Sequence, residues 1–176
     1  METAMDTIFE AADIAIENGY AFNILSDKGV DKDKAPIPAL LVASGLHHHL
    51  IRKGTRMKVS IVLESGEPRE VHHFACLVGY GVNGINPYMA YEAIKELSDE
   101  KLLEYSYEDG VKRFNKACTK GIVKIMSKMG ISTIQSYQGA QIFEALGISE
   151  SVVNKYFTGT TTRIGGMGIE PVSYTH

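Results

Sequence analysis

The sequence lacks the features that would assign it to several specialised classes. No apolar run approaches the roughly 20 residues that a membrane-spanning helix requires. The first residues, METAMDTIFEAAD, are acidic and amphipathic, so we expect no secretory or mitochondrial leader. The sequence contains only two cysteines, Cys76 and Cys118, each on the apolar face of an expected helix. This pattern indicates buried, reduced thiols, so we expect a cytoplasmic protein that does not enter a membrane.

Recognisable catalytic motifs are also missing. The sequence has no Walker loop, and GYGVNG lacks the spacing of a dinucleotide-binding GxGxxG motif. No cysteine–histidine or serine–histidine–aspartate combination lies in a context that suggests a nucleophile. The lysines of the C-terminal part are not interleaved with aromatic residues, and the chain as a whole is acidic, which argues against a nucleic-acid partner. We therefore expect no catalytic residue within this chain.

What is present is a chain able to bury a sizeable core, with an uneven distribution of charge. Hydrophobic residues make up 44% of the 176 residues and charged residues 22%, as in an ordinary globular protein. Residues 1–110 carry a net charge of −8, whereas residues 111–176 carry +5. This asymmetry suggests that the two parts have different surroundings, and that the second one faces an acidic neighbour.

The stretch 57–93 carries the clearest structural pattern. Residues 57–63 are apolar and β-branched without polar alternation, which is typical of a strand covered on both faces. Val71, Phe74, Ala75 and Val78 recur at helical spacing, and glycines then separate this helix from a short strand over 82–86. Two buried strands joined by one amphipathic helix are expected to be parallel, with a right-handed crossover.

The flanking sequence extends this β-α-β unit into an α/β fold. Helices are expected over 4–18 and 39–52, with a strand over 20–25 between them, and a further helix is expected to run to about residue 97. The order predicts a parallel sheet with flanking helices, βαβαβ, either barrel-like or Rossmann-like. We expect a core over 1–97, an acidic linker over 98–110 and a mainly helical segment over 111–176. The alternative that all of it forms one domain stays open.

The C-terminal segment is expected to begin with a long helix over 111–129 that has two distinct faces. A short strand over 131–134, a helix over 138–146 and a helix capped by Ser149 through about residue 157 follow, before a small, polar, glycine-rich tail. The apolar stripe of the long helix comprises Val111, Phe114, Cys118, Ile122, Ile125 and Met129, and the basic ridge comprises Lys112, Lys116, Lys120, Lys124 and Lys128.

Two loops are candidates for holding a phosphate group. Ser65 and Gly66 belong to one loop, and Asn83 and Gly84 belong to the other. Both loops are expected at the carboxyl ends of adjacent parallel strands, the edge at which α/β sheets and barrels bind ligands. Three glutamates around the first loop would repel an anion. The alternative is that the glycines only permit tight turns.

Two histidine clusters, 47–49 and 72–73, raise the question of a metal site. Consecutive helical residues point about 100° apart, so three in a row cannot face one ion. The i,i+4 spacing with a neighbouring carboxylate, usual for zinc on a helix, is absent. We therefore predict no metal site, and we expect these histidines to pack or to cap helices.

Five runs of the sequence closely resemble the glutamate synthase family, in the central region of the large subunit. This region lies between the glutamine amidotransferase domain and the FMN-binding barrel. The resemblance extends from about residue 24 to residue 168. The runs are HHHLIRKG, ESGEPREVHHFA, GYGVNGINPYMAYE, MSKMGISTIQSYQGAQIFEALG and FTGTTTRIGG.

The resemblance implies a role in glutamate biosynthesis and ammonia assimilation, by oxidoreductases that make glutamate from glutamine and 2-oxoglutarate. It implies FMN and an iron–sulfur cluster in the complete enzyme but no cofactor in this segment, whose cysteines do not match the cluster motif. It also implies a scaffold that positions the amidotransferase and FMN-binding domains and walls the ammonia path. Alternatives are a stand-alone phosphate- or flavin-binding module, or a separately encoded subunit. Candidates for facing the neighbouring domains are Ser26, Asp27, Ser65, Asn83 and Asn86.

Overall fold

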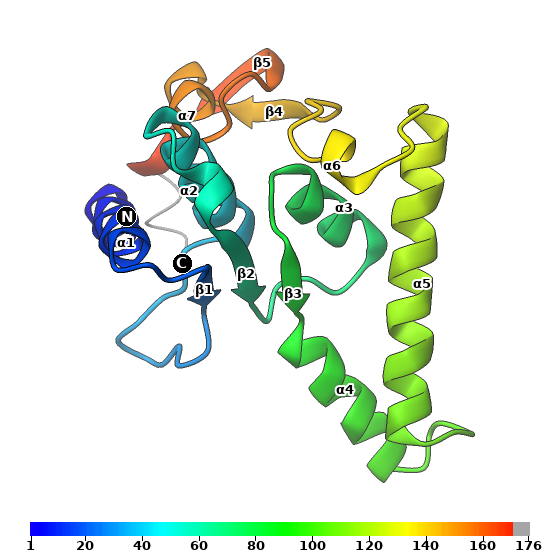
Figure 1. Cartoon of the computed structure of the whole chain (residues 1–176). Coiled ribbons are helices and arrows are strands. Elements are labelled where there is room, and N and C mark those ends of the chain that lie inside the picture. The colour runs from blue at the N-terminus through cyan, green and yellow to red at the C-terminus, as the bar shows by residue number, and fades with distance from the viewer. Residues whose placement is uncertain (171–176) are drawn as a thin grey trace.

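The computed structural model describes residues 1–170, which form a helix-flanked sheet with two helices extending to one side (Figure 1). The first half contains α1 (Glu2–Glu17), β1 (Phe22–Ser26), α2 (Ala39–Arg52), the 3₁₀ turn η1 (Arg56–Lys58), β2 (Ser60–Glu64), α3 (Val71–Gly79) and β3 (Gly84–Asn86). The second half contains α4 (Tyr88–Asp99), α5 (Tyr107–Lys128), α6 (Ile134–Tyr137), β4 (Glu144–Ile148), α7 (Glu150–Tyr156) and β5 (Thr161–Met167).

The main sheet has three parallel strands in the order β1-β2-β3. Successive strands are joined by α2 and α3, so the predicted α/β fold with a parallel sheet and flanking helices is confirmed. Side chains of β2 alternate between the two faces of the sheet. Ile61 and Leu63 are buried among the helices, whereas Val62 lies between Ile24 and Gly84 in register on the opposite face. The strand expected over 57–63 begins later, because its first residues form η1.

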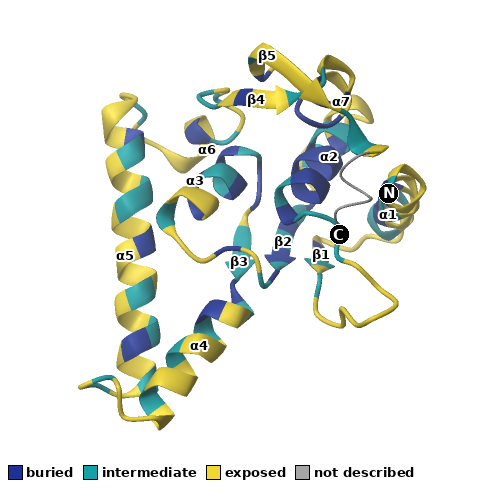
Figure 2. Ribbon diagram, turned by 180° about the vertical axis from the view of Figure 1, so that it is seen from behind, coloured by how far each residue is buried: buried dark blue, intermediate teal, exposed yellow. Residues whose placement is uncertain are grey.

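The hydrophobic core is centred on α2, which is buried along most of its length (Figure 2). α1 and α7 pack against it, with Met5, Phe9 and Tyr156 in the same cluster. Gly45 makes this close approach possible, because a Cβ atom there would lie 2.6 Å from Met5 Cε and 3.0 Å from Phe9 Cζ. The N-terminal helix and the C-terminal part of the chain are thereby joined in one core.

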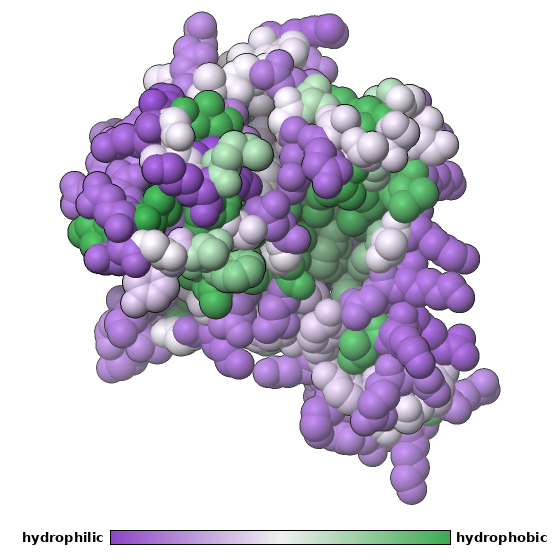
Figure 3. All heavy atoms as spheres, viewed as in Figure 1, coloured by the Kyte–Doolittle hydropathy of each residue, from purple (hydrophilic) through white to green (hydrophobic). Residues whose placement is uncertain are grey.

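α5 packs by one face against α3 and α4. Its predicted two-faced pattern is confirmed in outline: Cys118 is buried and Phe114 half-buried, while the lysines of the ridge are exposed. At the end of the helix the prediction is wrong, because Met129 is 53% exposed and Met126 is buried instead. Phe114 contacts the rings of Phe74 on α3 and Tyr91 on α4. Ser106 caps the helix by accepting a hydrogen bond from the N–H of Asp109, so α5 begins earlier than predicted. Only residues 100–106 separate it from α4, and the end formed by the two helices is predominantly hydrophilic (Figure 3).

Beyond α5 the structure differs from the prediction. The strand expected over 131–134 and the helix expected over 138–146 are wrong; the chain forms α6 and β4 instead. Gly139 and Gln141 have φ values of +77° and +56°, which a right-handed helix excludes. β4 then pairs in parallel with β5, which lies in the small, polar, glycine-rich tail, where the sequence predicts no strand. The helix predicted after Ser149 is confirmed as α7, and residues 171–176 of the predicted helical segment lie outside the described residues.

Within residues 1–170, none of the helices combines the length and the apolar character needed to cross a membrane.

Candidate functional site

A polar layer lies at the carboxyl edge of the main sheet, on the face turned away from α2. It contains the last residue of each strand, because Ser26, Glu64 and Asn86 are in register across β1, β2 and β3. The Ser26 hydroxyl donates to Glu64 Oε2 at 2.6 Å, and the Asn86 amide donates to Glu64 Oε1 at 3.2 Å. One glutamate carboxylate therefore links all three strands. The sequence predicts Ser26 and Asn86 at this edge, but it does not predict that Glu64 joins them.

A second layer lies one residue further along the chain. The Ser65 hydroxyl donates to Asp27 Oδ2 at 2.5 Å, and the N–H of Gly66 lies 3.1 Å from both Asp27 carboxylate oxygens. Ser65 is completely buried and also accepts a hydrogen bond from the N–H of Glu67 at 3.1 Å. The donors of the predicted phosphate-binding loop are thus taken up by a carboxylate of the same chain.

The amino terminus of α2 is closed in a similar way. Pro38 occupies the N-cap position and supplies no side-chain hydrogen bond. The Glu67 carboxylate compensates, with both of its oxygens 3.1 Å from the N–H of Ala39. A negative charge at a helix amino terminus stabilises the exposed N–H groups and the helix dipole. This helix end, which could have served an external anion, is therefore already capped.

Tyr88 covers the second layer. Loss of contact with water, together with the hydrogen bond and the charge that Asp27 presents, raises the pKa of its phenol to about 12. The hydroxyl therefore stays protonated, which suits a donor beside a carboxylate. Lys28 Nζ lies 5.6 Å from the centre of the Tyr88 ring. Gly66 leaves room for this arrangement, since a Cβ there would lie 3.2 Å from the Tyr88 hydroxyl oxygen and 2.8 Å from Met89 Cγ.

The geometry does not fit the phosphate of FMN at this edge. A phosphate would have to displace the Asp27 carboxylate from the Ser65 hydroxyl and the Gly66 N–H, with the Glu64 carboxylate in the adjacent layer. Like charges at such close range oppose binding. The carboxyl edge is instead a layer of hydrogen bonds in which the carboxylates of Asp27 and Glu64 already accept from donors of the same chain.

Asn83 and Gly84 do not belong to this edge, so their predicted placement is wrong. They follow α3 and enter β3 at its beginning, and Asn83 Oδ1 accepts the N–H of Ile61 at 3.0 Å near the start of β2. They lie at the amino edge, where a crossover helix delivers the chain to the next strand. The two proposed phosphate-binding loops are therefore at opposite ends of the strands and cannot hold one group together.

The amino edge is organised by Arg56, a residue that the sequence did not single out. Its guanidinium donates to His47 Nδ1 at 2.9 Å, Val59 O at 2.7 Å, Gly81 O at 2.6 Å and Asn83 Oδ1 at 3.0 Å. All four acceptors are uncharged. Burial, reinforced by the charges of Arg56 and His48, lowers the pKa of His47 to about 4. His47 is thus a neutral acceptor in a structural cluster that joins α2, η1 and the start of β3.

The histidines have separate partners and do not form one cluster. His49 Nε2 lies 2.9 Å from Asp13 Oδ2 and its ring stacks on Phe9, while His72 Nε2 lies 3.6 Å from the Cys76 sulfur. Residues 1–170 contain no group of three or more histidine, cysteine, aspartate or glutamate side chains placed to hold a metal ion. His47 and His49 do pack, as expected.

The two cysteines do not fit an iron–sulfur cluster. Such clusters are held by several closely placed thiolates, whereas this sequence has only Cys76 on α3 and Cys118 on α5. Burial, with a smaller contribution from Glu70, raises the pKa of Cys76 to about 11, and the pKa of Cys118 is raised for the same two reasons. Both side chains therefore stay protonated thiols at neutral pH.

Sequence comparison places this arrangement in a known family. Residues 1–149 match the family model described as the glutamate synthase central domain. The chain is 53% identical over 173 residues to the large chain of glutamate synthase [NADPH] of Bacillus subtilis, covering 98% of this chain and 11% of the relative. It is 43% identical to glutamate synthase [NADH] of Schizosaccharomyces pombe and 42% identical to the ferredoxin-dependent enzyme of Pyropia yezoensis, covering 8% and 11% of these proteins. The chain thus spans about a tenth of the length of these relatives.

Solved structures show the same fold at much lower identity. A flavocytochrome b2 mutant with bound pyruvate superimposes with a TM-score of 0.55 at 18% identity, over 75% of this chain and 32% of the other. The recombinant flavin-binding domain of baker's yeast flavocytochrome b2 gives 0.54 at 17% identity, over 87% and 38%. These barrel-like domains support the fold alone. On the sequence relationships, the chain belongs to the glutamate synthase central domain family.

Proposed function

We propose that this chain is a non-catalytic scaffold segment of a cytoplasmic glutamate synthase. In this proposal the complete enzyme forms glutamate from glutamine and 2-oxoglutarate, with FMN and an iron–sulfur cluster bound by other parts of the polypeptide. The carboxyl edge of the β1-β2-β3 sheet faces the amidotransferase and FMN-binding domains and helps to wall the path of ammonia between them. Its residues in this role are Ser26, Asp27, Ser65 and Asn86, joined by Glu64 and Tyr88.

The observation that carries the proposal is that the hydrogen-bond donors at this edge already have acceptors within the same chain. Ser65 and Gly66 donate to Asp27, and Ser26 and Asn86 donate to Glu64. A site for substrate or phosphate needs donors that are free to turn to a ligand, whereas a wall needs donors that are already satisfied. The raised thiol pKa values of the two cysteines also argue against a nucleophile in this chain.

A polar, rigid wall suits ammonia transfer on physical grounds. Ammonia released into bulk water at neutral pH becomes protonated and loses its nucleophilicity, so a path that excludes water preserves its reactivity. Carboxylates whose oxygens already accept hydrogen bonds are held in place, so they can line such a path without moving into it and blocking it.

The test uses a complete glutamate synthase that carries this segment. Asp27→Ala and Glu64→Ala, made separately, are expected to leave glutamine hydrolysis close to its original rate, while less glutamate is formed per glutamine consumed and ammonia accumulates. Asp33→Ala, in the exposed loop before α2, is the matched control. Unchanged coupling between the two reactions in both edge variants would overturn the proposed wall.

The alternative of a stand-alone phosphate- or flavin-binding module gains no support from the geometry, because its two loops lie at opposite edges and the donors of the first loop are already engaged.

A further inference from the structure

The free edge of β1 presents main-chain groups that have no strand partner among residues 1–170. Ser60 N–H donates to Ala21 O at 2.9 Å, and Asp27 N–H donates to Glu64 O at 3.1 Å. In a parallel ladder, alternate residues bond to the same neighbour. The main-chain groups that bond to β2 are therefore those of residues 21, 23, 25 and 27. The N–H and C=O groups of Phe22, Ile24 and Ser26 point away from β2.

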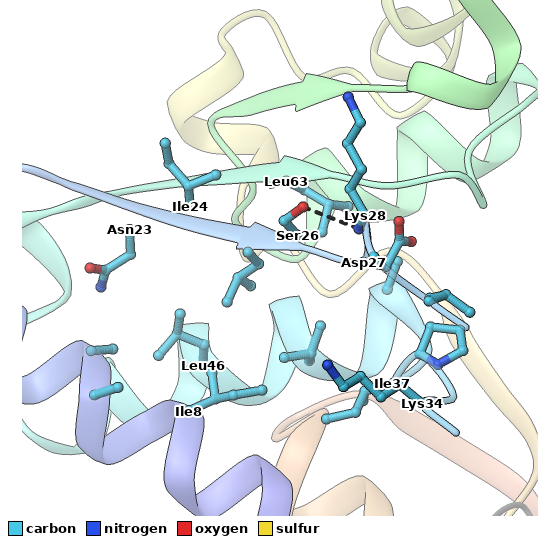
Figure 4. A pocket seen from close by; sticks show the side chains of 18 of the residues that line it. Ile8, Asn23, Ile24, Ser26, Asp27, Lys28, Lys34, Ile37, Leu46 and Leu63 are labelled. Carbon is cyan, nitrogen blue, oxygen red and sulfur yellow. Dashed lines mark hydrogen bonds between the residues drawn. The ribbon is translucent and has the colours of Figure 1, made fainter. Parts of the chain in front are cut away.

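A buried side chain at the same edge also lacks a partner among the described residues. Asn23 is only 8% exposed, and its Nδ2 has no hydrogen-bond partner within residues 1–170. Its side chain extends from β1 on the side of the helices, opposite to Ile24 (Figure 4). A buried amide group without a partner is rare in native proteins, because it loses its hydrogen bonds to water and gains none in return. This donor therefore points to an acceptor that residues 1–170 do not supply.

A groove runs along this edge with a volume of about 710 Å³ (Figure 4). Its floor is apolar and includes Ile8 and Ala12 of α1 with Leu46 of α2, and β1 itself forms one wall. On the opposite face of β1, Phe22 and Ile24 remain 65% and 67% exposed. Strands of parallel sheets are ordinarily buried on both faces, so an edge with this exposure is an incomplete one.

We propose that this groove receives a further parallel β-strand, supplied by another segment of the same longer polypeptide, which continues the sheet beyond β1. The added strand bonds to the outward main-chain groups of Phe22, Ile24 and Ser26. One of its main-chain carbonyl oxygens accepts from Asn23 Nδ2, and its side chains alternate between the apolar floor and the face of Phe22 and Ile24.

The position of α1 fixes the direction and the place of this strand. α1 packs on α2, on the same side of the sheet as the helices that cross over between the strands. Crossovers between parallel strands are right-handed, so a strand leading into α1 lies beside β1 on the edge away from β2. The solved flavin-binding barrels match only about a third of their length to this chain, and closing a barrel leaves no strand edge free.

The source is the same polypeptide for two reasons. The glutamate synthase relatives are about ten times longer than the matched segment, so their chains contain many residues beyond it. A second copy related by a two-fold axis would pair the β1 strands antiparallel, which contradicts the direction set by α1.

Hydrogen–deuterium exchange at the amides of β1 tests this inference. One sample is the 176-residue chain, and the other is the large chain of the Bacillus subtilis enzyme with these residues replacing its matching segment. The amides of Ile24 and Ser26 are expected to exchange at least about tenfold more slowly in the long chain. The amide of Leu25, which faces β2, should be protected in both. Equal exchange of Ile24 and Ser26 in the two samples would overturn the proposal.

Two substitutions sharpen the test. Ile24→Pro removes an outward N–H, so it should leave the melting temperature of the 176-residue chain nearly unchanged but abolish the added protection of Ser26 in the long chain. Leu25→Pro, the matched control, should destabilise both. If Ile24→Pro does not fold, Asn23→Leu provides the test. It should stabilise the 176-residue chain, but it should accelerate amide exchange of β1 in the long chain. If it stabilises β1 in both chains or destabilises β1 in both, the proposal is contradicted.

Sedimentation velocity on the short chain completes the design. A monomer is expected, and a dimer with protected Ile24 and Ser26 amides would assign the edge to a second copy and overturn the proposal. None of these outcomes depends on ammonia transfer, so this inference and the proposed function can fail separately.

Discussion

The hydroxyl of Ser65 and the carboxylate of Asp27 meet at 2.5 Å, although 38 residues separate them in the sequence. They follow the ends of two paired strands, so the parallel register of β1 and β2 brings them together. The same carboxylate accepts the N–H of Gly66. In this position a side chain of the chain itself fills the place that a bound anion takes in many α/β proteins.

Removing this carboxylate should destabilise the sheet edge. Asp27→Ala leaves the buried Ser65 hydroxyl and the Gly66 N–H without their acceptor, and we expect the free energy of unfolding to fall by about 1–3 kcal/mol. Urea denaturation measures the change, with Asp33→Ala on the exposed loop as the control. If the two variants are equally stable, the Asp27 hydrogen bonds contribute nothing net.

The amino edge predicts a dependence of stability on pH. Because burial lowers the pKa of His47 to about 4 while the unfolded chain titrates near 6.5, the unfolded state binds the proton first. The contribution of neutral His47 to the free energy of unfolding is therefore complete above pH 6.5. It is lost as the pH falls toward 4, at up to about 1.4 kcal/mol per pH unit. The pKa of His48 is also lowered, chiefly by burial, and adds in the same direction.

Denaturation curves at pH 7 and pH 5 measure this dependence. His47→Gln should flatten it, because glutamine can still accept from Arg56 but does not titrate. His73→Gln, at an exposed position of α3, serves as the control and should keep the full slope. A slope that is the same in His47→Gln and the unmodified chain would show that another group is responsible.

The sequence was informative where structure is local. The apolar stripe of α5, the helices around the main sheet and the Ser149 cap follow from spacing and capping within a few residues. β4 could not be predicted in this way, because it depends on pairing with β5, more than a dozen residues further on. The left-handed Gln141 gives no compositional signal.

The same distinction holds for the candidate site. Ser26, Asp27, Ser65 and Asn86 were predicted because strand ends place them at one edge. Asn83 was misplaced, although the order of elements shows that a loop after a crossover helix enters the next strand at its amino end. The Arg56 cluster depends on η1 and on the close approach of Gly81, which neither periodicity nor a motif reveals.

Gly81 should be the glycine most sensitive to substitution at the amino edge. Its φ is +95°, and a Cβ atom there would collide with the His47 ring. Gly81→Ala therefore combines backbone strain with disruption of the Arg56 cluster, and we expect a loss of more than about 2 kcal/mol. Gly54→Ala is the matched control, because its φ is +71° but a Cβ atom there would have no atom of the described residues within 4 Å apart from its chain neighbours. Strain alone should cost it about 1 kcal/mol; similar losses in the two variants would mean that the contact with His47 is unimportant.

Cys76 should react slowly with alkylating reagents despite being only half-buried. Burial and the nearby charge of Glu70 raise the pKa of its thiol from 9.0 to about 11, which lowers the thiolate population at pH 8 about a hundredfold. A Cys118→Ala variant isolates this thiol, and its rate of reaction with iodoacetamide in the folded state is compared with the rate in urea. Glu70→Gln should accelerate the folded reaction by removing the negative charge. Equal rates in the folded and unfolded chain would contradict the raised pKa and reopen the question of a reactive cysteine on α3.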